Sequence, residues 1–298
     1  MQNPSQPLTI ELKDKRKLAY TEYGAADGFP VFIFHGTPGS RLWFTEDDET
    51  AASLQIRLIS TDRPGFGASD RLPGRRVLDW PSDVAALADA LGLERFAVLG
   101  VSGGGVYAAA CAYVIPERLT SATMVSSAAP FPGGKPPKSM SAANRFAFTL
   151  SKRVPWLLRL SYNAQKKMIE QSPDKFLRSL RGGNGHLTDW DRQFMQTDEH
   201  FSEFMMHLGE ALRQGPEEAA SEPGLLSQDW GFDPAAITIP VLIWHGEADR
   251  MAPFDEIRKL AARMPTSRLQ THKEAGHFLS SDEASWKEIL QAIIQKPS

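Results

Sequence analysis

The chain has 298 residues and a net charge of −3, with 42 % hydrophobic and 23 % charged residues, a balance that allows one large domain, or a domain carrying an insertion, to bury a sizeable core. The small negative charge gives no support to a nucleic-acid-binding role, and the single cysteine, Cys111, excludes an internal disulfide and a cysteine-based metal cluster. Because the sequence has no signal-like segment and no apolar run of about 18 residues, we expect a cytoplasmic protein without a transmembrane segment.

Short apolar runs alternate with helical patterns over the first part of the chain. Strands are expected at Leu8–Leu12, Lys17–Tyr23, Pro30–Phe34, Ile56–Ser60 and Phe96–Leu99. The first two suit a hairpin, and the other three are compact enough to be strands buried on both faces of a parallel sheet. Apolar residues at helical spacing predict helices over Val77–Leu91 and Val106–Tyr113. This alternation favours β-α-β units and a mainly parallel sheet.

The pattern changes after Ala129. Prolines and glycines crowd the segment Pro130–Pro137, which is typical of a hinge or linker. Residues 139 to 229 then show helical patterns and no convincing strand, before strands resume at Ile239–Trp244 and Arg268–Thr271 and a helix follows at Ser285–Ile294. We therefore predict an α/β core formed by residues 1–129 and 237–298, interrupted by an all-helical insertion over residues 130–236.

A serine lies in the glycine-rich run from Gly100 to Gly104, between a predicted strand and a predicted helix. A serine on a sharp strand-to-helix turn holds its hydroxyl clear of the sheet, and its neighbours must be small because the backbone is pinched there. The run alone would also suit a plain turn. Its strand–turn–helix setting makes Ser102 the candidate nucleophile.

A serine hydroxyl needs a base, and the best candidate among the seven histidines is His277. It follows the small residues Ala275 and Gly276 on a loop between the last strand and the last helix, although a helix-capping role is the plainer alternative. His35 and His245 each end a strand and precede a glycine, which favours hydrogen bonds within their own loops. His272 adjoins the last strand, where a structural role is favoured.

The base in turn needs a buried carboxylate that fixes its tautomer, and Asp249 is the candidate. It lies on the turn that leaves the strand Ile239–Trp244. Glu247 is the rival acid on the same turn, with a surface position as its plainer interpretation. A carboxylate could also come from the loop after Met124–Ser127, but the stretch from Ala128 to Phe131 offers no acid, which strengthens the choice of Asp249.

Acyl transfer also needs two hydrogen-bond donors for the developing oxyanion. The backbone N–H of Gly103, directly after the serine, can be one, and that of Thr37, on the loop after the strand Pro30–Phe34, can be the other. The following residue, Pro38, has no N–H to give. His35 and Gly36, on the same loop, are added as candidate substrate-binding residues, although a tight turn without a ligand is as good an interpretation of this loop.

Taken together, these elements resemble the α/β-hydrolase family, in its serine-nucleophile branch with a helical lid. The order of nucleophile, acid and histidine is that of the family, and the run from Asp62 to Ser69 resembles its loop after the next sheet strand, where Asp62 would brace the backbone. The resemblance covers Leu8 to about Ala128 and Ile239 to Ile294. Ser102 stands where related epoxide hydrolases and haloalkane dehalogenases have aspartate, which argues against both activities. Thr37 departs from the Gly-Gly-Pro-Gly loop of the proline-specific aminopeptidases, so that activity is ranked lower.

The resemblance implies a helical lid over the site, and a helix is expected at Asp198–Arg213 within it. Phe204 and Met205 lie on its apolar face and are candidate substrate-binding residues, with a core role as the alternative. The expected reaction is hydrolysis of a small-molecule carboxylic ester, lactone or thioester with an apolar part, without metal or cofactor. The alternatives are carbon–carbon bond hydrolysis of a diketone, perhydrolysis, or a ligand sensor that keeps the triad.

Overall fold

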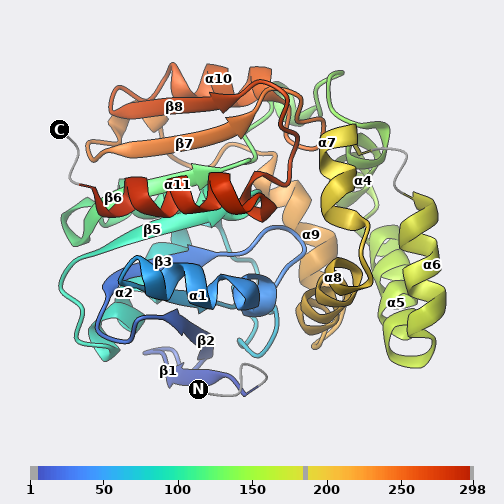
Figure 1. Ribbon diagram of the computed structural model, residues 1–298. Coiled ribbons are helices and arrows are strands. Elements are labelled where there is room, and N and C mark those ends of the chain that lie inside the picture. Colours follow the sequence, from blue (N-terminus) through green and yellow to red (C-terminus); the bar gives the residue numbers. More distant parts are fainter. Residues whose placement is uncertain (1–5, 184–186, 296–298) are drawn as a thin grey trace.

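The structure is a computed structural model that describes residues 6–183 and 187–295, and it is built around one eight-stranded sheet (Figure 1). The strands follow one another across the sheet in the order β1-β2-β4-β3-β5-β6-β7-β8. Their bounds are Leu8–Glu11 for β1, Lys17–Gly24 for β2, Phe29–Phe34 for β3, Ile56–Thr61 for β4, Phe96–Val101 for β5, Leu119–Val125 for β6, Val241–Gly246 for β7 and Ser267–His272 for β8. Strand β2 pairs antiparallel with β1 and β4, and all other pairings are parallel, which confirms the predicted sheet.

Helices cover both faces of the sheet, and the alternation of side chains along each strand decides what they pack against. On β3, Val31 and Ile33 join the core under α1 (Asp48–Ser53) and α11 (Glu283–Ile294). Phe32 and Phe34 point to the other face, whose core lies under α2 (Trp80–Ala90), α3 (Gly104–Val114) and α10 (Phe254–Ala261). Burial on both faces explains why this strand has no polar residue in the sequence.

Some helices of the core differ from the sequence-based expectation. Helix α2 begins only at Trp80, because Val77–Asp79 forms a 3₁₀ turn ahead of it and Pro81 occupies the first turn, where a missing N–H costs nothing. The short helices α1 and α10 were not predicted, because six or eight residues give too little periodicity to recognise.

Six helices, called the inserted helices from here on, lie between β6 and β7, where the described residues form no strand. They are α4 (Ala142–Arg153), α5 (Pro155–Gln171), α6 (Pro173–Gly183), α7 (Asp189–Arg192), α8 (Asp198–Ala211) and α9 (Glu217–Leu226). Helix α8 is the predicted helix at Asp198–Arg213, and the Thr197 hydroxyl caps it by accepting from His200 N. In Figure 1 these helices stand together at one end of the sheet.

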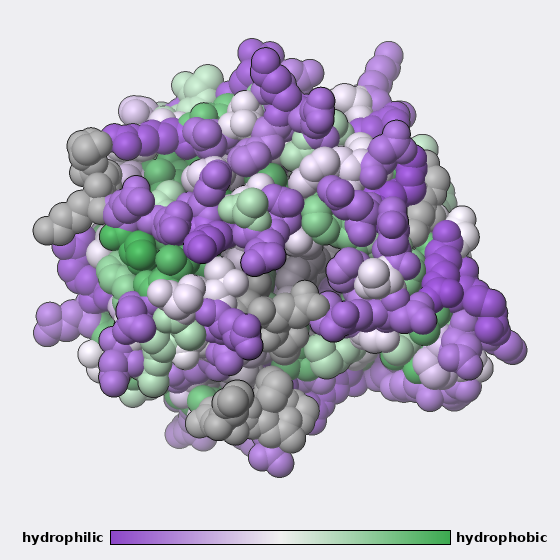
Figure 2. All heavy atoms as spheres, viewed as in Figure 1, coloured by the Kyte–Doolittle hydropathy of each residue, from purple (hydrophilic) through white to green (hydrophobic). Residues whose placement is uncertain are grey.

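The surface is mainly hydrophilic on the face drawn in Figure 2, with apolar residues scattered in small groups. No helix in residues 6–183 and 187–295 combines the length and the apolar character needed to cross a bilayer.

Candidate active site

Ser102 stands on a sharp turn between β5 and α3, with a backbone φ of 54°. This left-handed conformation is rare for a residue with a side chain and costs about 1–3 kcal/mol. The flanking glycines are required sterically, because a Cβ on Gly100 would lie 2.1 Å from the carbonyl oxygen of Gly104, and one on Gly104 would lie 2.1 Å from that of Phe34. The Ser102 N–H donates to Val125 O at 2.8 Å and fastens the turn to β6.

His277 and Asp249 meet Ser102 at the same edge of the sheet, because the loops after β5, β7 and β8 leave the carboxyl ends of parallel strands. His277 Nε2 lies 3.1 Å from Ser102 Oγ, and His277 Nδ1 lies 2.8 Å from Asp249 Oδ2. The other oxygen of Asp249 accepts the N–H groups of Met251 and Ala252 at 2.7 and 2.8 Å. When Nδ1–H donates to Asp249, the lone pair of Nε2 faces the serine hydroxyl.

Burial and charge act in opposite directions on this histidine and carboxylate. Burial lowers the pKa of His277, but the charge and hydrogen bond of Asp249, together with the charge of Asp191, outweigh burial and raise that pKa above its ordinary value. Burial raises the pKa of Asp249, but His277 and His245 outweigh burial there, so that pKa lies below its ordinary value. The pair is therefore an ionised carboxylate and an imidazole that takes up a proton readily.

His245 lies 3.4 Å from Asp249, measured from its Nε2 to Oδ2. The same nitrogen is 2.7 Å from Ala252 O, as expected for an N–H that donates to that carbonyl. Burial lowers the pKa of His245 below its ordinary value, so the ring is neutral at neutral pH. His245 therefore stabilises the loop after β7 through its hydrogen bond to Ala252, as its position in the sequence suggested.

Thr37 and Gly103 pack against each other beside Ser102. A Cβ on Gly103 would lie 2.2 Å from Thr37 Oγ1, so only glycine allows the threonine side chain to lie over the turn. Within the described chain, no turn or loop hydrogen bond uses the backbone N–H of Thr37 or of Gly103. Gly103 caps the N-terminus of α3, the end of a helix that favours negative charge.

Glu222, on the inserted helix α9, is fully buried beneath this loop. Its carboxylate accepts from Arg63 Nε and Nη2 at 2.9 and 2.8 Å, from Arg75 Nη2 at 2.9 Å, from the hydroxyl of Tyr107 at 2.8 Å and from that of Thr37 at 2.6 Å. Burial raises the pKa of Glu222, but the two guanidinium groups outweigh burial and hold it well below its ordinary value. An inserted helix is thereby tied directly to the loop that carries Thr37.

Other carboxylates of the inserted helices also contact loops of the core, Glu210 and Asp191 among them. Glu210, on α8, accepts from Arg41 Nη1 at 2.5 Å, and the same nitrogen donates to Asp62 at 2.7 Å. Asp62 also accepts the N–H of Ala68 at 2.9 Å, so it braces its own loop as the sequence suggested. Asp191, on α7, accepts the backbone N–H of His277.

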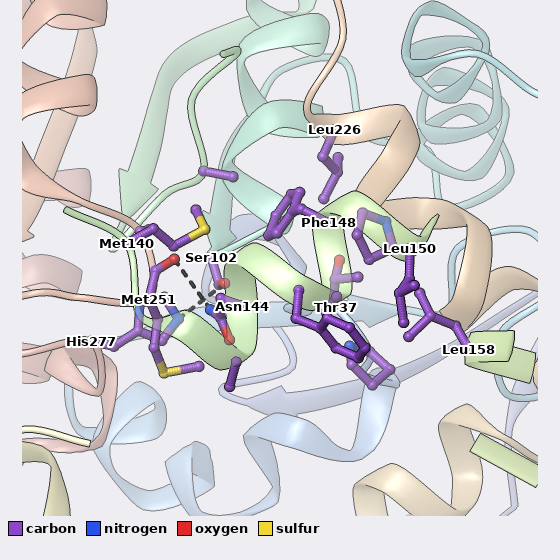
Figure 3. Close-up of a pocket in the computed structure, with 18 of the residues that line it drawn as sticks. Thr37, Ser102, Met140, Asn144, Phe148, Leu150, Leu158, Leu226, Met251 and His277 are labelled. Atoms are coloured by element: carbon purple, nitrogen blue, oxygen red, sulfur yellow. Dashed lines mark hydrogen bonds between the residues drawn. The ribbon is translucent and has the colours of Figure 1, made fainter. Parts of the chain in front are cut away.

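A cavity of about 870 Å³ lies between Ser102 and the inserted helices (Figure 3). Ser102, His277, Thr37 and Gly103 line it on the core side. The inserted helices contribute mainly apolar side chains, among them Phe146, Phe148, Leu150, Leu157, Leu158, Leu160, Phe204 and Leu208. Glu256 is the one carboxylate in the lining, and no lysine or arginine of the described chain belongs to it.

Three of the four candidate substrate-binding residues do not line this cavity. The side chain of His35 is fully buried, where its Nδ1 lies 2.8 Å from Gly36 O and its Nε2 accepts the N–H of Arg63. Gly36 is likewise absent from the lining, and its carbonyl accepts from Arg63. On α8, Phe204 and Met205 both pack against the core cluster that contains Phe66, Phe176 and Leu208, but only Phe204 also lines the cavity. Of the four candidate substrate-binding residues, only Phe204 therefore lies at the cavity.

Sequence reasoning missed Asp191, Glu210, Glu222, Arg41 and Arg75. The acids stand on α7, α8 and α9, where the sequence favours a solvated carboxylate, and Asp191 and Glu222 are buried and Glu210 partly buried only because these helices dock on the core. Arg63 was noticed as part of the run beginning at Asp62, but nothing in that run indicates an ion pair with a residue 159 positions away.

No three histidine, cysteine, aspartate or glutamate side chains come together to hold a metal ion within residues 6–183 and 187–295. Cys111 is buried in α3, and burial raises its pKa well above the ordinary value, so the thiol stays protonated and packs as a small apolar group.

Comparison with known proteins places these observations in a family. The chain is 28 % identical over 291 residues to a non-heme chloroperoxidase of Streptomyces lividans, covering 92 % of this chain and 94 % of that protein. It is 26 % identical over 288 residues to a 2-hydroxy-6-oxo-6-phenylhexa-2,4-dienoate hydrolase of Comamonas testosteroni, covering 95 % and 93 %. Among solved structures, a thermophilic esterase from Thermogutta terrifontis superposes with a TM-score of 0.65 at 23 % identity, covering 97 % and 96 %. The sequence model for the alpha/beta hydrolase fold matches residues 30–284, and this chain therefore belongs to the alpha/beta hydrolase fold family.

Proposed function

We propose that this protein is a serine hydrolase that cleaves neutral, apolar carboxylic esters through a covalent acyl-enzyme. The observation that carries the proposal is the chain of contacts from Ser102 Oγ to His277 Nε2 at 3.1 Å and from His277 Nδ1 to Asp249 at 2.8 Å, beside an apolar cavity. Nucleophile, base and orienting carboxylate at these distances are the requirement for serine-based acyl transfer.

In the proposed reaction, His277 Nε2 takes the proton of Ser102 Oγ as that oxygen attacks the ester carbonyl carbon. The carbonyl oxygen becomes an oxyanion, which accepts hydrogen bonds from the backbone N–H groups of Thr37 and Gly103. His277 then gives its proton to the leaving alcohol, and an acyl group remains on Ser102. In the second half, His277 activates water, which releases the carboxylic acid, while Asp249 stabilises the imidazolium at each stage.

The cavity supports the choice of a neutral substrate. The dienoate named for the Comamonas relative carries a carboxylate, and an anion taken out of water needs a cation or several donors to offset its desolvation. No lysine or arginine of the described residues lines this cavity, and its carboxylate, Glu256, pairs with Lys259 and gives an anion no hydrogen-bond donor. A neutral ester with an aliphatic or aromatic acyl group avoids that penalty.

Matched substrates test the substrate class. The rates of the purified protein would be compared on butyrate and hexanoate aryl esters and on esters of equal length that end in a carboxylate. We expect the terminal carboxylate of the charged esters to lower kcat/KM at least roughly tenfold. Burying a charge without a partner costs more free energy than a tenfold change in rate represents. Faster cleavage of the charged esters, or of a dienoate diketone, would contradict the proposed substrate class. Release of one equivalent of product and no more would indicate a sensor.

Matched variants test the chemistry. Ser102→Ala should abolish turnover and labelling by a fluorophosphonate. Asp249→Asn should lower kcat by about 10⁴, as the equivalent change does in serine proteases. Glu247→Gln on the same loop is the control, because Glu247 is exposed and accepts only from the hydroxyl of Thr271 among the described side chains. A large loss with Glu247→Gln and none with Asp249→Asn would assign the acid to Glu247.

A further inference from the structure

Asp191 is a buried carboxylate of the inserted helices whose hydrogen bonds go to the loop of His277. It lies on α7 with 1 % of its surface exposed. Its Oδ1 accepts the backbone N–H of His277 at 2.6 Å and that of Phe278 at 3.0 Å, and its Oδ2 accepts the hydroxyl of Thr188 at 2.8 Å. The loop is shaped around this contact, because a Cβ on Gly276 would lie 2.2 Å from Asp191 Oδ2.

This carboxylate differs from the two other acids of the inserted helices described above. Glu210 and Glu222 pair with arginines, whereas no lysine or arginine of the described chain forms an ion pair with Asp191. A buried carboxylate without a cation is costly unless hydrogen-bond donors satisfy it. Here two of those donors are the main-chain N–H groups of the proposed base and its neighbour. The arrangement therefore places the negative charge of Asp191 beside the loop of His277, whose imidazole becomes positively charged during the proposed reaction.

We propose that Asp191 is a positioning residue for His277. Asp191 holds the main chain of His277 by accepting its backbone N–H, and Asp249 holds the imidazole ring through Nδ1. Together the two contacts point Nε2 at Ser102 Oγ. The charge of Asp191 also favours the imidazolium that forms when Ser102 gives up its proton. This inference rests on the proposed function, since it assigns Asp191 a part in the same proton transfer.

The charged and titratable groups that face His277 allow the sign of the effect to be worked out. They are Asp249 from the loop after β7, Asp191 from α7 and, behind Asp249, the neutral His245 of β7. Burial lowers the pKa of His277, and the charges of Asp249 and then Asp191 raise it. A general base works only when neutral, so kcat/KM rises as the pH passes upward through this pKa. Removal of the charge of Asp191 therefore moves the rise to lower pH.

The decisive variant is Asp191→Asn. The amide oxygen still accepts the two main-chain N–H groups, and the amide NH₂ can donate to the Thr188 hydroxyl, so shape and hydrogen bonds are kept while the charge is lost. Asp189→Asn is the matched control, because Asp189 stands two residues away on the same helix, is 93 % exposed in its side chain and pairs with Arg192. Asp191→Ala removes the hydrogen bonds as well.

The rates of all three variants on a short neutral ester would be measured across the titration of His277, and the ring of His277 would be titrated by NMR. We expect Asp191→Asn to move both inflections to lower pH, and Asp191→Ala to lower kcat roughly 10- to 100-fold with little change in KM, the scale of a slightly misplaced catalytic group. Asp189→Asn should match the parent.

An unchanged inflection in folded Asp191→Asn would overturn the assignment, and so would an equal shift in Asp189→Asn. If Asp191→Ala does not fold, the asparagine variant decides. The activity of Ser102→Ala distinguishes failure of the proposed function from failure of the role proposed for Asp191. An active Ser102→Ala variant would overturn the proposed function itself, whereas an inactive one combined with an unmoved inflection would overturn only the role of Asp191.

Discussion

The inserted helices α4–α6 and α7–α9 are attached to the core in different ways. Within the described chain, α4, α5 and α6 each bury a single residue, namely Ser151, Leu158 and Phe176. They also expose large apolar side chains, with Phe146, Trp156 and Leu160 each more than half exposed. Helices α8 and α9 bury four and six residues. Helix α7 buries only Asp191, but α7–α9 together supply the carboxylates that contact the loops of Thr37, Arg41 and His277.

This difference indicates that the two groups of inserted helices have different roles. The half with buried carboxylates belongs structurally to the candidate site, because Glu222 and Asp191 hydrogen-bond to residues next to the proposed reacting atoms. The other half forms much of the apolar cavity wall with few buried anchors. Regions with little buried apolar surface open at lower free energy than the core. We therefore expect substrate to be admitted by motion of α4–α6, while α7–α9 stay in place.

The largest effect is expected from Glu222→Ala. It leaves the buried guanidinium group of Arg63 without its carboxylate partner and leaves Arg75 with Glu218 alone, and breaking a buried ion pair from one side costs about 3–5 kcal/mol. The free energy of unfolding in urea measures this loss. Glu217→Ala on the same helix is the control, because Glu217 and Arg71 are partly exposed and such pairs contribute about 1 kcal/mol or less. Equal losses in the two variants would contradict the anchoring role of Glu222.

A smaller effect is expected in native-state hydrogen exchange. Because α5 buries only Leu158, its amides should exchange roughly tenfold or more faster than those of α8, which is packed on the core. Mass spectrometry of peptides from both helices makes the comparison within one sample. Equal protection of α5 and α8 would remove the distinction between the two halves.

The smallest effect distinguishes two neighbours on α8. Phe204 lines the cavity and Met205 does not, so Phe204→Ala should shift preference toward longer acyl chains by about fourfold in kcat/KM for each methylene that the new space holds. Met205→Ala should lower stability by about 1–2 kcal/mol and leave the preference unchanged, since it is only partly buried against core residues. An acetate-to-octanoate series, measured beside the melting temperature, separates the two. A shift with Met205→Ala would place the pocket elsewhere.

Local chemistry made the sheet and the serine turn predictable from the sequence. The apolar run of β3 has to be buried on both faces, and the glycines around Ser102 are needed because a Cβ would collide with backbone at either side. Parallel strands also bring their carboxyl ends to one edge, so the strand-following positions of Ser102, Asp249 and His277 implied that their side chains would meet.

Only the tertiary structure decided which polar groups of the inserted helices are buried. Asp191, Glu210 and Glu222 lie near other acids on α7, α8 and α9, and helical periodicity does not tell a solvated carboxylate from one that docks on an arginine or a main-chain N–H. Periodicity likewise places Phe204 and Met205 on one face. The docking of α8 then packs both side chains against the same core cluster and places only Phe204 at the cavity, because contacts between segments far apart in the sequence set that orientation.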